Sequence, residues 1–78
     1  MGDNMYQLRI RDLREDRDLS QQTIADFLQV HQTTYSDYEL ERINTPVSVL
    51  HKLADFYNVS VDYLLGRTNV KEPYPKKD

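Results

Sequence analysis

The chain has 78 residues, which is enough for one small domain with a short tail and too few for a second domain. It contains no cysteine, so disulfides, thiolate zinc sites and thiol chemistry are excluded. Ten Lys and Arg against 13 Asp and Glu give a formal net charge of −3, whereas nucleic-acid binders usually carry a basic excess. Two glycines and three prolines favour helices over a strand-rich fold.

The sequence shows no sign of a membrane segment or of an enzyme site. No apolar run approaches the ~20 residues that a membrane span needs, and the first residues, MGDNMYQ, lack the features of a secretory signal. We therefore expect a cytoplasmic protein with no membrane partner. A Gly-rich phosphate loop, a metal-ligand cluster and a nucleophile with a paired base are all missing. The sequence predicts no catalysis, no metal, no cofactor and no small-molecule ligand.

Periodic apolar residues predict an all-α domain of five helices. The helices are expected at residues 6–17, 20–28, 31–41, 47–57 and 61–65, with boundary errors of about two to four residues. Ser20 and Ser60 precede two of them as N-caps, and Pro46 precedes a third. The apolar faces predict a core of Ile10, Leu13, Ile24, Ala25, Leu28, Tyr35, Leu50, Leu53, Ala54, Val59 and Leu64.

Composition then sets the domain limits. Residues 1–5 are expected to be an N-terminal extension and residues 6–66 the domain, which Gly66 closes. Residues 67–78, RTNVKEPYPKKD, carry two prolines and scattered charge, so we expect a flexible C-terminal tail.

The joint between the second and third helices carries the functional signal. Two short helices joined by a tight turn, the second polar on its outer face, are typical of a helix-turn-helix unit. Periodicity alone leaves an ordinary helical hairpin open as the alternative, because small all-helical domains have many uses.

The run from Leu8 to Gly66 resembles the phage-repressor and Cro-type helix-turn-helix family, called the XRE family, over about three quarters of the chain. The residues that carry the resemblance are Leu13-Arg14, Leu19-Ser20-Gln21, Ile24-Ala25, Val30, Tyr38-Glu39, Pro46, Leu53-Ala54 and Val59-Ser60-Val61-Asp62-Tyr63-Leu64-Leu65. The resemblance implies a lambda-repressor-like domain that places its third helix in the major groove of double-stranded DNA. It also implies a homodimer on a palindromic operator.

The family pattern assigns base contacts to four residues of the third helix, Gln32, Thr33, Ser36 and Asp37. Gln32 is the best candidate, because a carboxamide pairs with N6 and N7 of adenine. Thr33 offers a methyl contact to thymine. For Asp37, acceptance from cytosine N4 and repulsion of phosphates both stay open.

The family pattern assigns contacts with the DNA backbone to Ser20, Gln21, His31, Arg42 and Asn44. Gln21 matches the position that grips a phosphate and steadies the first base-reading residue. Ser20 is a helix cap in any case, His31 can equally be an exposed neutral side chain, and Arg42 can equally be a solvated surface charge.

Arg14 and Glu39 match a family ion pair that links the first helix to the end of the third, and we expect its role to be structural. One departure lies in the turn, where the family usually has Gly and this chain has Gln29, so the turn is expected to be strained or different.

The other departure is charge. Between Ser20 and Thr45 the only Lys or Arg is Arg42, against four acidic residues. This acidity keeps an alternative open: a protein-interaction module on the same fold, antitoxin-like or an accessory subunit, with weak or no DNA binding. Positive charge is available from Arg9, Arg11, Arg17, Lys71, Lys76 and Lys77.

A weak two-fold dimer is expected around Val49 and Tyr63, because a single short domain has few contacts for tight specific binding. Otherwise Tyr63 packs against the tail, with Tyr74 as a partner. The operator sequence, the regulated genes, the sign of regulation and the oligomeric state in solution do not follow from the sequence.

Overall fold

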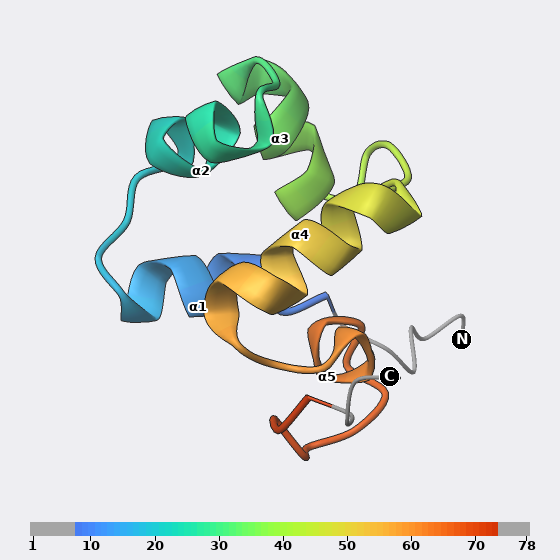
Figure 1. Cartoon of the computed structure of the whole chain (residues 1–78). Helices are drawn as coiled ribbons and strands as arrows, with labels where there is room; N and C mark the ends of the chain where they lie inside the picture. Colours follow the sequence, from blue (N-terminus) through green and yellow to red (C-terminus); the bar gives the residue numbers. More distant parts are fainter. Residues whose placement is uncertain (1–7, 74–78) are drawn as a thin grey trace.

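The computed structural model describes residues 8–73, and within this range the chain forms helices and no strand (Figure 1). The elements in chain order are α1 (Ile10–Asp16), α2 (Gln21–Leu28), α3 (Gln32–Glu39), α4 (Val47–Tyr57) and α5 (Val61–Leu64). None of these helices is long and apolar enough to cross a membrane. The prediction of an all-α fold with five helices is confirmed.

The helices α2 and α4 lie within one residue of their predicted bounds, whereas α1 begins later than predicted. Leu8 and Arg9 are not helical, so the expected start at residue 6 is wrong for these two residues. The physical reason is a tertiary bond: the backbone N–H of Arg9 donates to the carbonyl of Leu64 at 2.8 Å. This bond ties the start of α1 to the end of α5.

The helix α3 is also shorter than predicted. His31 has an extended backbone and is the N-cap, so the first helical residue is Gln32. At the other end Glu41 adopts a positive φ of 58°, which stops the helix after Glu39.

Side chains from all five helices form one core. All of the residues predicted for it are buried, and Tyr38, Val49 and Tyr57 are buried with them. Ile24, Tyr35, Leu53 and Leu64 have no exposed surface. In Figure 1, α2 and α3 lie together at one end of the molecule and α5 lies at the opposite end, with α1 and α4 between them.

The segment after α5 is held against the domain as far as the structure describes it. The guanidinium of Arg9 donates to the carbonyl of Thr68 (2.9 Å) and lies 4.2 Å from the ring centroid of Tyr63. The backbone N–H of Ser60 donates to the carbonyl of Lys71 at 2.9 Å. The start of the predicted tail therefore continues the domain surface, and its last five residues lie outside the described range.

Candidate nucleic-acid interface

The candidate interface is built on α2, the turn after it and α3. Ser20 begins α2 with an extended backbone, and its hydroxyl oxygen accepts the N–H of Thr23 at 3.0 Å. Such a cap satisfies one of the four free N–H groups of a helix start. The other N–H groups at this end of α2 are suited to an anion such as a phosphate.

The turn reverses the chain through Gln29, which has φ 61° and ψ 43°. In this left-handed conformation the backbone N–H of the next residue, Val30, donates to the carbonyl of Ala25 at 3.0 Å. A residue with a Cβ pays about 1–2 kcal/mol in this region, where glycine does not. The expected strain is therefore present at Gln29, and the turn keeps the geometry that glycine prefers.

The helix α3 has one anchored face and one outward face. Tyr35 and Tyr38 are buried in the core, and their rings meet edge to face with centroids 6.4 Å apart. Gln32 and Thr33, at the start of the helix, are exposed. The other two predicted base-reading residues, Ser36 and Asp37, are half-buried. His31 is exposed and makes no side-chain hydrogen bond as the N-cap.

The loop after α3 exposes the two residues predicted there to contact the DNA backbone, Arg42 and Asn44. Arg42 is not isolated: its guanidinium lies 3.8 Å from a carboxylate oxygen of Asp37, and its backbone N–H donates to the Asp37 carbonyl at 2.9 Å. The side-chain pair is largely exposed and therefore weak. It nevertheless places a cation beside the acidic residue of α3 and partly offsets that charge.

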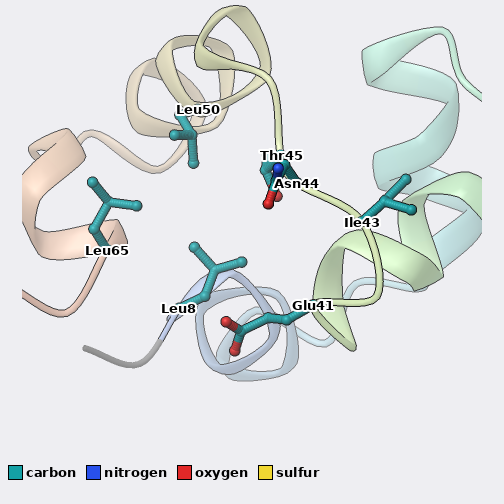
Figure 2. Close-up of a pocket in the computed structure, with 7 residues that line it drawn as sticks. All are labelled: Leu8, Glu41, Ile43, Asn44, Thr45, Leu50 and Leu65. Carbon is teal, nitrogen blue, oxygen red and sulfur yellow. The ribbon is translucent and has the colours of Figure 1, made fainter. Parts of the chain in front are cut away.

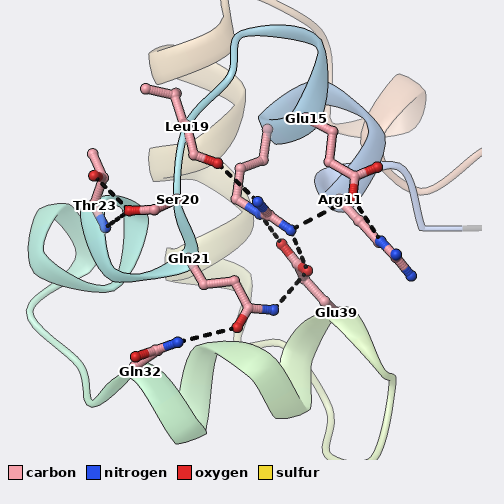
Figure 3. Close-up of polar contacts among 9 residues, drawn as sticks. Arg11, Glu15, Leu19, Ser20, Gln21, Thr23, Gln32 and Glu39 are labelled. Carbon is pink, nitrogen blue, oxygen red and sulfur yellow. Dashed lines mark hydrogen bonds and ion pairs between the residues drawn. The ribbon is translucent and has the colours of Figure 1, made fainter.

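A chain of hydrogen bonds runs from α1 through the interface to the first residue of α3 (Figure 3). The guanidinium of Arg14 binds both carboxylate oxygens of Glu39, with Nε to Oε2 at 2.7 Å and Nη2 to Oε1 at 3.1 Å. Nε2 of Gln21 donates to Oε1 of Glu39 at 3.0 Å, and Nε2 of Gln32 donates to Oε1 of Gln21 at 3.4 Å. The ion pair expected from the family pattern thus also holds a predicted phosphate contact and a predicted base contact.

The ion pair between Arg14 and Glu39, from which this series of hydrogen bonds starts, is buried. The side chain of Glu39 is 2% exposed and that of Arg14 is 12% exposed. Burial alone would raise the pKa of Glu39, but hydrogen bonds, chiefly from Arg14, outweigh it and lower the pKa. The hydrogen bond to Glu39 in turn raises the pKa of Arg14. Both partners are therefore ionised in the folded protein at neutral pH.

Two tyrosines line the inner side of this ion pair. The hydroxyls of Tyr35 and Tyr57 are both buried. Burial, with the negative charge of Glu39 adding to it, raises the pKa of Tyr35. Burial likewise raises the pKa of Tyr57 to about 12. Both phenol groups are therefore neutral in the folded protein at neutral pH.

The residues predicted for a dimer contact lie in different environments. Val49 is 8% exposed and belongs to the core, so it offers a partner almost no surface. Tyr63 is half-buried, with Arg9 over its ring at 4.2 Å and Nζ of Lys71 at 5.9 Å from its centroid. The alternative partner, Tyr74, lies outside the described residues.

Comparison with known proteins identifies the family. A model of the helix-turn-helix family matches residues 10–64, a range that contains all five helices. The chain belongs to the XRE-type helix-turn-helix family. The family resemblance seen in the sequence is therefore confirmed, and the unit formed by α2, the turn and α3 is its helix-turn-helix.

Several curated regulators are similar to this helix-turn-helix chain. The uncharacterized HTH-type transcriptional regulator YobD of Bacillus subtilis is 38% identical over 69 residues, which are 88% of this chain and 62% of YobD. The cryptic phage CTXphi transcriptional repressor RstR of Vibrio cholerae is 36% identical over 75 residues, 94% of this chain and 68% of RstR. The HTH-type transcriptional regulator AnsR of B. subtilis is 34% identical over 68 residues, 87% of this chain and 59% of AnsR.

The chain thus spans about three fifths to two thirds of the length of these relatives. No solved structure gave a significant match.

The cations suggested as a source of positive charge are partly engaged inside this helix-turn-helix domain. Arg11 pairs with Glu15 at 3.2 Å, and Arg17 donates to the Tyr57 carbonyl at 3.3 Å. Arg9 holds the segment after α5, as described above. Lys76 and Lys77 lie outside the described residues. Within residues 8–73, the contacts of Arg9, Arg11 and Arg17 therefore bind them to the segment after α5, to α1 and to α4 rather than to α2 or α3.

The sequence did not predict three hydrogen bonds between distant residues. The bond from Gln21 to Glu39 joins residues 18 positions apart on different helices, and the bonds from Arg9 to Thr68 and Asn69 span 59 and 60 positions. No local pattern encodes any of them. For the bond to Glu39, a carboxylate with spare acceptor sites was the only signal available in the sequence.

Proposed function

We propose that this chain is a sequence-specific, double-stranded DNA-binding transcriptional regulator that acts in the cytoplasm and inserts α3 into the major groove. The observation that carries the proposal is the two-sided character of α3. Tyr35 and Tyr38 anchor one face in the core, while Gln32 and Thr33 stand exposed at the start of the helix. A major groove about 12 Å wide admits such a helix with its polar side chains against the base edges.

The names of the relatives, which are transcriptional regulators and a repressor, support this function over the protein-interaction alternative. They also support a binding role without catalysis.

In the proposed complex Gln32 contacts a base directly and Thr33 contacts a thymine methyl group. Ser36 and Asp37, one turn further along α3, face the next base pairs from half-buried positions. Asp37 is partly neutralised by Arg42, which lowers its repulsion of nearby phosphates. Base contacts of this kind give sequence preference, because each base pair presents a distinct set of donors and acceptors in the major groove.

Phosphate contacts position the helix. Ser20 and Gln21 lie at the N-terminus of α2, where free N–H groups attract an anion, and His31 lies at the start of α3. Arg42 and Asn44 reach the backbone from the exposed loop after α3. These contacts set affinity for any sequence and are weakened by salt.

Two copies of the chain are proposed to bind a palindromic operator, with half-sites about one helical turn, ~34 Å, apart. Because Val49 is buried, we propose the contact at Tyr63 and at the hollow drawn in Figure 2. The hollow has a volume of about 360 Å³, and Leu65, two residues after Tyr63, lines it. Leu8 and Ile43 also line the hollow, and Ile43 is 44% exposed and available to a partner.

Binding-site selection from random duplexes, followed by titration of variants, tests the function. Gln32→Ala is expected to relax preference at one base position by about 1–3 kcal/mol. Arg42→Ala is the matched control from the same face: it is expected to weaken binding to all sequences and to reduce the salt slope by about one unit.

Failure of the wild-type chain to enrich any sequence would refute the proposal. Equal, sequence-independent losses in the two variants would refute the assignment of Gln32. Sedimentation with the selected duplex tests the dimer: two protomers per duplex are expected, and one protomer at saturating protein would refute it.

A further inference from the structure

The hydrogen-bond chain of Figure 3 has a fixed direction. Glu39 accepts from Gln21, and Gln21 in turn accepts from Gln32. A glutamine carboxamide has a donor end and an acceptor end of nearly the same shape, so its direction is normally set by its partners. Here the partner that sets the direction of Gln21 is the carboxylate of Glu39.

An ionised carboxylate can only accept hydrogen bonds. The carboxylate of Glu39 is held ionised and buried by the two bonds from Arg14, and its side chain is only 2% exposed. Turning the Gln21 amide around would place its oxygen against this negative charge. Gln21 is therefore held with Nε2 toward Glu39 and Oε1 toward α3.

The oxygen of Gln21 then fixes the next amide. Nε2 of Gln32 faces Oε1 of Gln21 at 3.4 Å and donates one of its two N–H groups. The second N–H and the oxygen of Gln32 stay available on the exposed side of the helix. One donor beside one acceptor is the set that adenine requires at N7 and N6.

We infer that Glu39 is a positioning residue for DNA specificity, which sets the direction of the Gln21 and Gln32 amides so that Gln32 accepts adenine and rejects guanine. The inference rests on the proposed function, because it refines how Gln32 contacts a base. The opposite direction of both amides would turn the Nε2 group of Gln32 fully toward the groove. Two donors would then face the DNA, and guanine presents two acceptors, O6 and N7.

The test replaces the carboxylate of Glu39 by an amide. In Glu39→Gln, the new amide at position 39 offers Gln21 either a donor or an acceptor. Both orientations of the Gln21 amide therefore become available. Glu15→Gln is the matched control, because it makes the same chemical change in the other carboxylate that lies near Arg14, at 4.0 Å, and that carboxylate is not part of the bond between Gln21 and Glu39. All proteins are titrated below their melting temperatures with duplexes that carry adenine or guanine at the position where Gln32→Ala loses preference.

The wild-type chain and Glu15→Gln are expected to prefer adenine by about 5- to 150-fold, the range of a good bidentate contact. Glu39→Gln is expected to reduce this ratio to within roughly 3-fold of equality, chiefly through a gain for guanine. An unchanged adenine preference in Glu39→Gln would overturn the inference while leaving the proposed function intact. A selection in which Gln32→Ala alters no position would instead refute the base contact itself, and the inference with it.

Glu39→Gln also removes a buried ion pair, so a second variant covers the case in which it does not fold. Gln21→Met removes the link and leaves the bonds between Arg14 and Glu39 in place. It is expected to bind all sequences less tightly and to lose most of the preference for adenine over guanine. A Gln21→Met protein that keeps the wild-type ratio would overturn the inference by itself.

Discussion

Replacing Gln29 by glycine is expected to stabilise the protein. Gln29 ends α2 at φ 61° and ψ 43°, and its side chain is exposed, so removing that side chain costs little packing. The substitution acts on the turn on which the position of α3 depends. It therefore measures the strain stored at the joint of the helix-turn-helix.

The magnitude follows from two opposing effects. The left-handed conformation costs a residue with a Cβ about 1–2 kcal/mol, and glycine avoids this cost. Glycine also makes the unfolded chain more flexible, which removes about 0.4–1 kcal/mol of stability. The net gain is about 0.5–1 kcal/mol, which raises the melting temperature of a domain of this size by about 2–8 °C.

Thermal and urea unfolding followed by circular dichroism measures this gain. Two controls isolate the backbone effect. Gln29→Ala removes the side chain but keeps the Cβ, and we expect little change. Asn58→Gly changes another left-handed residue, at φ 56°, but asparagine tolerates this region, so a smaller gain is expected. A Gln29→Gly protein that is no more stable than the wild type, or than Gln29→Ala, would refute the reasoning.

Three further substitutions or conditions test the core, the buried ion pair and the caps. Leu53 has no exposed surface, so Leu53→Ala is expected to lower the free energy of unfolding by about 2–5 kcal/mol in urea titrations, and unchanged stability would contradict its place in the core. Because folding lowers the pKa of Glu39 below the ordinary value of about 4.3, its ion pair stabilises the protein above that pH. This contribution is lost as the pH falls through the lowered pKa of Glu39 in the folded protein. Urea unfolding from pH 7 to pH 2 should therefore show a decrease in the free energy of unfolding that is larger in the wild type than in Glu39→Gln. Ser20→Ala and Ser60→Ala each remove one N-cap hydrogen bond and are each expected to cost about 1 kcal/mol, so a neutral effect of both would argue against these caps.

The features that the sequence predicted well are those set by neighbouring residues. Ser20 and Pro46 mark the starts of α2 and α4, and both helices lie within one residue of expectation. The helical periodicity of apolar side chains was enough to predict most of the buried residues, including Tyr35 in the otherwise polar α3, but it did not assign Tyr38, Val49 and Tyr57 to the core. The departure at Gln29 was also visible, because the position normally carries glycine.

The features that it missed depend on residues far apart in the chain. The start of α1 is set by the bond from Arg9 to the carbonyl of Leu64, 55 positions later, and no periodicity near Arg9 reports it. From the sequence, Val49 is compatible both with the buried apolar face of α4 and with an exposed position in its first turn. Only the packing of the helices assigns Val49 to the core. The hydrogen bond between Gln21 and Glu39 likewise needs two helices to meet before its geometry exists.

The central claim is that α3 binds a specific DNA sequence in the major groove. The most direct measurement is the dissociation constant of the wild-type chain for its selected duplex and for a scrambled duplex of the same composition, over a range of salt concentrations. Binding to the selected duplex is expected to be at least about 10³-fold tighter than binding to the scrambled duplex at physiological salt. Both affinities are expected to fall with salt, with a slope near −0.9 per phosphate neutralised. Equal affinities for the two duplexes, or affinities that do not change with salt, would contradict the claim.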